Sequence, residues 1–343
     1  MANQLELHPA HGPHEPTTGT PRRRPGSVRR TSTIDSLRSG DLDRRVSLAG
    51  RARDLITHMD GTTTVAGSAR MAVDIAYTGG PVVQEIETTP HVVGVENLIG
   101  RIASAGFRAA IDADTTAAHG ELIYLLLDDI PVATLVSGYA VGHAVKRGDL
   151  TLTALTTMRA PGPPAHGPNM CAGFQVGGTI MNALADGGGH ALVTGPVATE
   201  IVDADDTIGW HEFPGPLRPD SMRRWRRADL WKNEDGLLEV DTFFRDSHLA
   251  SDGVETIIHE YTVAAVIDPV EMRILECEAT PRVLPWQECP QAAGSGARLA
   301  GMAVSGLRAQ ARAELLGITA CTHLTDQLRE IEDVATLLAL LPS

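Results

Sequence analysis

The chain has 343 residues, of which 43% are hydrophobic, and its formal net charge is −14. This length suits one large domain or two smaller ones, and the negative charge argues against nucleic acid as a partner. Four cysteines, at positions 171, 277, 289 and 321, do not form the dense framework of a small secreted protein. The best membrane candidate, residues 123–141, is interrupted by Asp128, Asp129 and Pro131. We therefore expect a cytoplasmic protein with reduced thiols and no membrane association.

Charge is unevenly distributed along the chain. Residues 1–53 hold ten Arg and five acidic residues, whereas residues 54–343 hold 19 basic and 38 acidic residues. The start of the chain is rich in Pro, Gly, Thr and His, shows no apolar periodicity and lacks the apolar stretch of a secretory signal. We predict a disordered basic tail over residues 1–50, an N-terminal α+β part over 51–215, and a C-terminal α+β domain over 216–343.

In the first half, the pattern predicts two strands, 71–77 and 82–87, joined at Gly79-Gly80-Pro81. Residues 159–216 are dense in Gly and Pro and are interpreted as loops over a site or as a poorly ordered insert. The glycines at 187–189 do not lead from a clear strand into a clear helix. With no P-loop and no dinucleotide fingerprint, we expect no nucleotide cofactor.

The second half predicts two hairpins followed by two helices. The hairpins are 228–231 with 237–247, and 255–267 with 272–279. The first helix covers about 295–316 and ends at Gly317, and the second begins with Thr322 as its N-cap. Strands followed by helices indicate an α+β fold in which the C-terminal helices pack on one face of an antiparallel sheet.

Acid–base residues gather on the second predicted hairpin. His259 and Tyr261 share one face of their strand. In a register whose paired residue numbers sum to 539, Glu276 and Glu278 join that face, and Tyr261 lies opposite Glu278. The alternative is an ordinary half-exposed sheet face with a Tyr–Glu hydrogen bond, since a one-residue slip separates the set.

Two further positions carry chemistry. Asp246 and His248 alternate onto one side at the end of the preceding strand, where they could orient an imidazole or bind a metal, or simply begin a turn. Cys321 precedes the positive end of the last helix, which favours a thiolate there, with His323 in the first turn. Cys289, Cys321 and His323 could form a zinc site, or the cysteines could be buried and inert.

Residues 223–227 combine four arginines with Trp225. Such a run can bind phosphate or nucleic acid. In an acidic chain we favour internal salt bridges instead, so the run is expected to serve the fold.

Residues 226–340 resemble an uncharacterised bacterial family, domain of unknown function 2889. The resemblance rests on His259-Glu260-Tyr261-Thr262, Ile267-Asp268, Glu288-Cys289-Pro290 after Pro285, Leu299-x-Gly301 and Cys321-Thr322-His323-Leu324. Ala320 stands where shorter members have Gly before the last motif. The resemblance implies a bacterial origin and a shared fold, and it implies no activity.

We expect an enzyme that acts on a small organic molecule by acid–base chemistry, of lyase or hydrolase type. His259 with Asp246 or His248 would transfer protons, Tyr261 would donate an electrophilic hydrogen bond, and His323 with Cys321 would act as ligand or nucleophile.

Two alternatives stay open. A metal-dependent enzyme would hold a single divalent ion, Zn or non-haem Fe, on His248, His259 and His323 with Asp246 or Asp326. A non-catalytic binding or assembly module would use the same residues as caps, turns and sheet pairs. The sequence leaves a homo-oligomer open.

Overall fold

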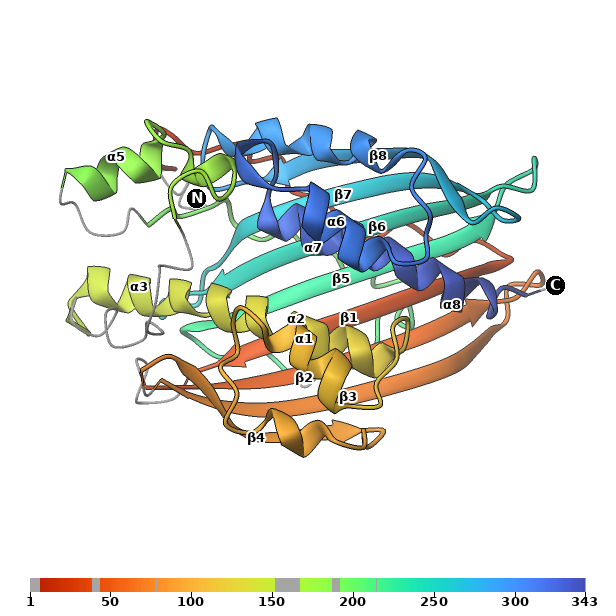
Figure 1. The fold of residues 1–343 in the computed structure, drawn as a ribbon, viewed down its shortest axis with the longest axis horizontal. Helices are drawn as coiled ribbons and strands as arrows, with labels where there is room; N and C mark the ends of the chain where they lie inside the picture. Colours follow the sequence, from red (N-terminus) through yellow and green to blue (C-terminus); the bar gives the residue numbers. More distant parts are fainter. Residues whose placement is uncertain are drawn as a thin grey trace.

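The computed structural model describes residues 7–38, 44–77, 79–151, 167–186, 192–213 and 215–342. Across these residues one eight-stranded antiparallel sheet runs in the order β4-β3-β2-β1-β5-β6-β7-β8, and the helices lie over one face (Figure 1). Of the described residues, 28% are helical and 33% lie in strands. The predicted α+β class, with C-terminal helices on one face of an antiparallel sheet, is confirmed. The glycines at 187–189 lie outside the described residues.

The strands are β1 (Ser27–Leu37), β2 (Arg45–Thr57), β3 (Thr63–Tyr77), β4 (Pro81–Thr89), β5 (Ser221–Lys232), β6 (Leu238–Leu249), β7 (Glu255–Asp268) and β8 (Arg273–Val283). The α-helices are α1 (Phe107–Asp114), α2 (Leu122–Val136), α3 (Gly138–Arg147), α5 (Thr179–Ala185), α6 (Leu307–Glu314), α7 (Thr322–Arg329) and α8 (Val334–Leu338). Short 3-10 turns are η1 (Val95–Leu98), η2 (Ala172–Phe174), η3 (Cys289–Ser295), η4 (Ala297–Leu299), η5 (Gly317–Thr319) and η6 (Glu330–Asp333).

The prediction of a disordered tail over residues 1–50 is wrong. β1 is a central strand, buried along almost its whole length, and β2 begins at Arg45. Its arginines are buried because carboxylates on neighbouring strands pair with them: Arg29 with Asp229 on β5, and Arg30 with Asp54 on β2. Since β1 joins β2 to β5, the sheet continues across the predicted boundary near residue 215.

The sheet is built from two equivalent halves. β1–β4 and β5–β8 are both antiparallel meanders, and they meet where β1 pairs with β5. The β2–β3 ladder is irregular after Asp54 and the β6–β7 ladder after Asp246. Across the β1–β5 junction, Arg29 pairs with Asp229 and Arg223 pairs with Asp35, both at 2.6 Å. These reciprocal pairs indicate a local pseudo-twofold axis between the halves.

The helices repeat as well. α1 and α6 are both eight residues long, and each follows a glycine at positive φ, Gly106 at 88° and Gly306 at 77°. Only glycine adopts this backbone readily, so each glycine sets the entry of its helix. α1 and α2 cover one half of the sheet, and α6 and α7 cover the other (Figure 1).

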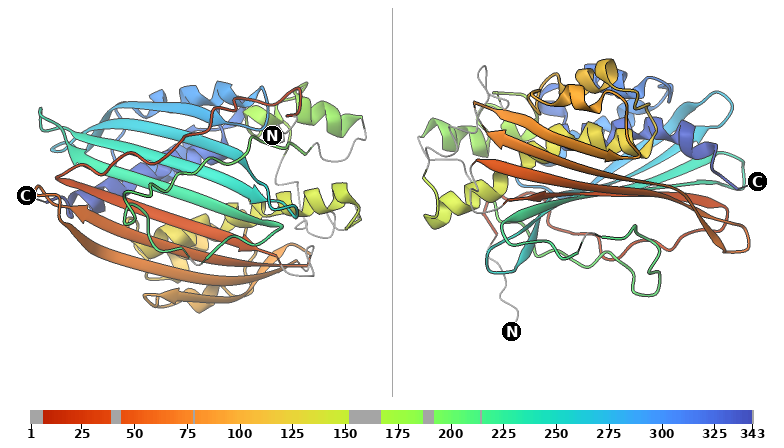
Figure 2. Two further views of the ribbon diagram at one scale, coloured as in Figure 1. Left: turned by 180° about the vertical axis from the view of Figure 1, so that it is seen from behind. Right: turned by 90° about the horizontal axis from the view of Figure 1, so that it is seen from below.

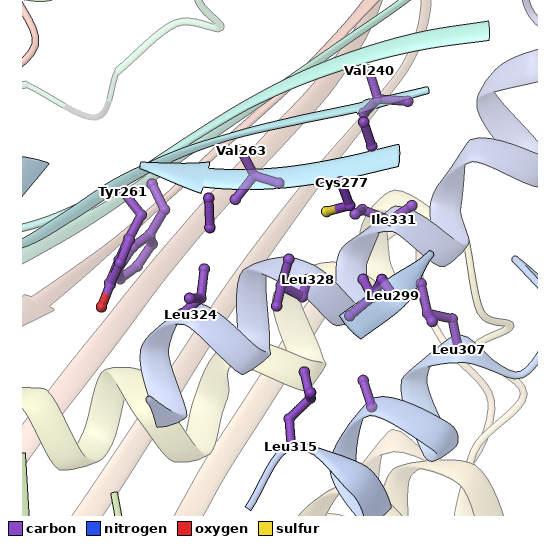
Figure 3. Packing of buried hydrophobic residues seen from close by; sticks show 14 of the residues in the cluster. Val240, Tyr261, Val263, Cys277, Leu299, Leu307, Leu315, Leu324, Leu328 and Ile331 are labelled. Atoms are coloured by element: carbon purple, nitrogen blue, oxygen red, sulfur yellow. The ribbon is translucent and has the colours of Figure 1, made fainter. Parts of the chain in front are cut away.

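Apolar side chains fill the space between sheet and helices in both halves. In the second half, Leu324 and Leu328 of α7 point at Val263 and Cys277 on the strands (Figure 3). The predicted helix over 295–316 is correct only from Leu307 onward, because residues 289–299 form 3-10 turns instead.

The opposite face of the sheet is covered by extended chain. The N-terminal segment and residues 192–213 cross it, seen as red and green traces in Figure 2. A small aromatic cluster, with Trp210 against Trp225 and Phe243, anchors this layer.

By length and composition, one helical stretch, Leu122–Arg147, could cross a membrane. Of its most apolar window, 72% is buried inside the protein, as is common for a core helix.

Candidate functional site

Asp246, His259 and His323 converge where β6 and β7 meet the first turn of α7. One ligand-capable atom from each lies within 4.8 Å of the others. Asp246 and His259 are cross-strand partners, and the ladder register shifts directly after them. Such irregularities re-aim side chains and recur beside functional sites. Here the register changes between the Asp246–His259 pair and the residue pairs that follow it at the end of β6.

The two imidazoles are stacked. The ring centres of His259 and His323 are 3.7 Å apart, with planes inclined by 19°. Phe244 lies beyond His323, at 6.3 Å and 25°. His259 Nδ1 is 3.7 Å from Asp246 Oδ2, which is charge-pair range but too long for a direct hydrogen bond. The side chain of His259 is 14% exposed and that of Asp246 only 1%, so solvent reaches the imidazole and not the carboxylate.

Arg224 of β5 holds the Asp246 carboxylate from behind. The guanidinium donates two hydrogen bonds of 3.0 Å, one to each carboxylate oxygen. Burial alone would raise the pKa of Asp246, but Arg224, followed by His259 and His323, holds that pKa below its ordinary value. Asp246 is therefore a fixed negative charge behind the imidazole pair.

Cys321 and Tyr261 lie deeper. Cys321, not Thr322, is the N-cap residue of α7, so the predicted Thr322 cap is wrong. Cys321 Sγ is 4.0 Å from His323 Nδ1. Burial raises the pKa of Cys321 to about 11, which overrides the helix dipole and contradicts the expected thiolate. Tyr261 is fully buried with its hydroxyl against Cys321.

Three thiols approach one another here. Ala172 N donates to Ala320 O at 2.9 Å, which brings the loop containing Cys171 to the start of α7. Burial, and then the nearby Cys321, raises the pKa of Cys289, so these two thiols are neighbours in space. All four cysteines are free.

The predicted register of the second hairpin is wrong. Tyr261 pairs with Pro281, not with Glu278. At the turn, Ile267 already pairs with Ile274 instead of Met272, and the ladder shifts once more between Val266 and Ile267. Glu276 and Glu278 lie on the exposed face, away from His259 and Tyr261.

Two predicted metal ligands have other surroundings. His248 lies on the same face as Asp246, but its ring contacts Tyr139 and His143 of α3. Asp326 pairs with Arg108 at 3.0 Å and with Arg329 at 3.1 Å, so its carboxylate is already neutralised. The site that the structure assembles therefore combines Asp246, His259, His323 and Cys321.

The arginine run over residues 223–227 forms internal salt bridges, as predicted. Arg226 pairs with Asp129 at 2.6 Å and with Glu330 at 2.7 Å, and Arg227 pairs with Asp229. Sequence reasoning missed that Arg224 in this run would position Asp246. A charge-pairing search between neighbouring strands would have identified the pair, since the two residues are directly opposite.

The first half of the sheet offers an internal comparison. Arg30 holds Asp54 in the way that Arg224 holds Asp246, with hydrogen bonds of 2.8 and 2.7 Å. Asp54 faces Gly67 across the ladder, where Asp246 faces His259. A Cβ on Gly67 would lie 3.4 Å from the side chain of Leu122, the first residue of α2. The second residue of α2 is Ile123, whereas the second residue of α7 is His323. The first half thus keeps the ion pair and lacks both imidazoles.

Residues 222–337 match the model of a family described as "Protein of unknown function (DUF2889)", which confirms the resemblance predicted from the motifs. No curated protein matches the chain. Among solved structures, one titled "Crystal structure of lipopolysaccharide binding protein" matches with 7% identity over 99% of this chain and 79% of that one. Its TM-score is 0.14, too low to indicate a shared fold.

Proposed function

We propose that the protein is an enzyme that acts on a small organic molecule by acid–base chemistry, of lyase or hydrolase type. The observation that carries the proposal is the partly exposed, stacked pair of His259 and His323 backed by the buried, ionised Asp246. A carboxylate behind an imidazole stabilises the protonated form and orients the ring for proton transfer.

In this proposal the two stacked imidazoles, His259 and His323, have different roles in proton transfer. Two imidazolium ions with ring centres 3.7 Å apart would repel each other, so we assign the two rings different roles. His259, beside the Asp246 carboxylate, is assigned the role of acid, and His323, stacked on it, the role of base. A substrate beside the stack would lose a proton to one ring and gain one from the other.

Cys321 gives the site a nucleophile in a hydrolytic version. Its thiol is protonated at neutral pH, so attack on a carbonyl would require proton transfer from Sγ to His323 Nδ1, 4.0 Å away. The fully buried Tyr261 supports the thiol and does not meet the substrate.

A metal-dependent hydrolase is the second candidate. Asp246, His259 and His323 supply three ligand atoms within 4.8 Å, a set that suits Zn or non-haem Fe. However, two imidazoles that bind one ion at about 2.0–2.1 Å have ring centres roughly 5 Å apart. The 3.7 Å stack would have to open, which favours the metal-free reading.

The test uses hydrolysis of 4-nitrophenyl acetate and a panel of carboxylic esters and β-hydroxy acids by the full-length protein. We expect His259→Gln and His323→Gln each to lower kcat/KM by about 10²–10⁴-fold with unchanged circular dichroism. The half-buried His58, whose ring contacts Thr64, supplies the control variant His58→Gln, which should leave the rate unchanged. Activity that survives in both site variants would contradict the proposal.

Two outcomes separate the alternatives. Activity lost with chelator and restored by Co²⁺ would favour the metal-dependent enzyme. Variants that lose only stability, with no turnover by the wild type on the panel, would favour a non-catalytic binding or assembly module. As part of this proposal, the protein acts in the cytoplasm and its partner is a small-molecule substrate.

A further inference from the structure

A second group of rings lies beside the candidate site. Tyr139 and His143 are four residues apart on α3 and share one face of the helix. Both pack on His248 of β6, with ring centres 5.3 Å from Tyr139 and 4.8 Å from His143. The rings of Tyr139 and His143 are themselves 4.5 Å apart, so the three side chains form one cluster.

Polar atoms in this cluster are buried without partners. His248 is 0% exposed, and neither of its ring nitrogens has a hydrogen-bond partner among the described residues. His143 Nε2 and the Tyr139 hydroxyl are unpaired in the same way. Leaving such an atom unsatisfied destabilises the folded protein. Four of them in one place indicate that something else binds there.

One ring nitrogen of His143 bonds to the backbone of Val193. Since Nε2 is the unpaired nitrogen, that bond leaves Nε2 with a bare lone pair. Metal-binding histidines are commonly oriented in this manner.

We propose that His143 and His248, with the Tyr139 hydroxyl as a third ligand, bind one divalent transition-metal ion of the zinc class. Two imidazoles on one ion at about 2.0–2.1 Å have ring centres roughly 5 Å apart, and the observed separation is 4.8 Å. Neutral imidazole nitrogens suit Zn, Cu, Ni and Co more than Mg or Ca. His143 is only partly buried, which gives an ion access to the cluster.

The surrounding charges permit a cation. Lys146 and Arg147 follow on α3, and both lower the pKa of His143. Arg147 is itself paired with Asp149 and Asp220, each at 2.9 Å, which offsets its charge.

The cluster adjoins the first site. Asp246 and His248 are two residues apart on one face of β6, a separation of about 6.6–6.8 Å along a strand. The cluster and the first site are therefore neighbours on one face of β6. The binding proposal itself does not depend on the acid–base function.

The test is equilibrium dialysis of metal-free, full-length protein against CoCl₂ and ZnCl₂, with metal content and the cobalt absorption spectrum as readouts. We expect one tightly bound equivalent in the wild type. His143→Ala should weaken binding by at least about 100-fold, since removing even a residue behind a ligand costs 10–100-fold. The double variant His259→Ala/His323→Ala should keep the ion.

Tyr139→Phe preserves the ring packing and removes only the hydroxyl. It should weaken binding and change the cobalt spectrum, which distinguishes a lost ligand from a lost fold. His143→Ala changes a partly exposed residue, so the test survives if His248→Ala fails to fold. Absence of cobalt binding by the wild type, or binding lost only in the His259/His323 variant, would overturn the proposal.

Discussion

The internal repeat supplies a matched pair of substitutions, Asp246→Asn and Asp54→Asn. Each removes the charge of a buried aspartate that accepts two hydrogen bonds from an arginine on the adjacent strand. Only Asp246 lies beside imidazoles. The two substitutions should therefore cost similar stability and differ in their effect on the site.

The expected loss of stability depends on which carboxylates still pair with each arginine after the substitution. Removing one partner of a buried ion pair costs about 3–5 kcal/mol. Arg30 keeps Asp333 at 2.9 Å, and Arg224 keeps Asp129 at 3.3 Å, so neither arginine is left uncompensated. We expect the low end, about 3 kcal/mol of unfolding free energy for each variant, with the two values within about 1 kcal/mol.

Urea unfolding measures the stability of each variant. NMR of the imidazole protons reports on the surroundings of His259 and His323, and ester hydrolysis reports on activity. Asp246→Asn should shift the His259 and His323 resonances and lower kcat/KM by about 10–100-fold, in line with the loss of a supporting carboxylate. Asp54→Asn should leave both unchanged. Equal effects of the two variants on the imidazoles, or a cost below 1 kcal/mol for either, would refute the reasoning.

The helix contacts, the buried imidazole of His248 and the thiols each give a further test. Asp128 forms ion pairs of 3.1–3.3 Å with Arg108, Arg308 and Arg329. Asp128→Asn should therefore lower the free energy of unfolding in urea by about 3–5 kcal/mol. The control variant, Glu276→Gln at an exposed position, should lower it by less than about 0.5 kcal/mol. Burial lowers the pKa of His248 to about 3 in the folded state, whereas the unfolded chain protonates this imidazole near pH 6.5. The contribution of His248 to stability is therefore full above pH 6.5 and falls as the pH drops toward 3. His248→Gln should flatten this part of the stability–pH curve, and an unchanged slope would contradict the burial of His248. Burial raises the pKa of Cys321 to about 11 and that of Cys277 to about 12. Iodoacetamide at pH 8 should therefore alkylate these two thiols at least about 100-fold more slowly in the folded protein than in the unfolded chain. Rapid labelling of Cys321 in the folded protein would support the thiolate hypothesis.

Local patterns predicted the hairpins of the second half well. Turn residues between 233 and 236 and at Asp268-Pro269 mark real strand ends. The pairing across the second hairpin could not be obtained from the turn residues alone, because the turn is longer than the sequence suggests and the ladder shifts between Val266 and Ile267. The expected approach of Tyr261 to Glu278 failed for this reason. The approach of Asp246 to His259 depends on the β6–β7 register, which no local pattern reveals.

β1 shows why composition misleads in this chain. A buried strand normally shows as an apolar run, but β1 carries Arg29, Arg30 and Asp35 in its buried part. Their partners are on β2 and β5, and residues 29 and 229 are far apart in sequence. A charged stretch therefore looked like a solvated tail. The helix predicted from residue 295 failed more visibly, since Gly301 and Gly306 both adopt positive φ.

The repeat separates residues that hold the fold from residues that carry chemistry. Arg224 and Asp246 have counterparts in Arg30 and Asp54, so this ion pair belongs to the architecture of each meander. His259 and His323 have no such counterparts. Gly67 takes the ladder position of His259, and Ile123 is the second residue of α2 as His323 is the second residue of α7. Packing does not require the imidazoles, since the first half closes the same space with an apolar contact. The ion pair is present in both halves, but only in the second does it lie beside a pair of partly exposed imidazoles, which is why we propose that the chemistry takes place at the start of α7.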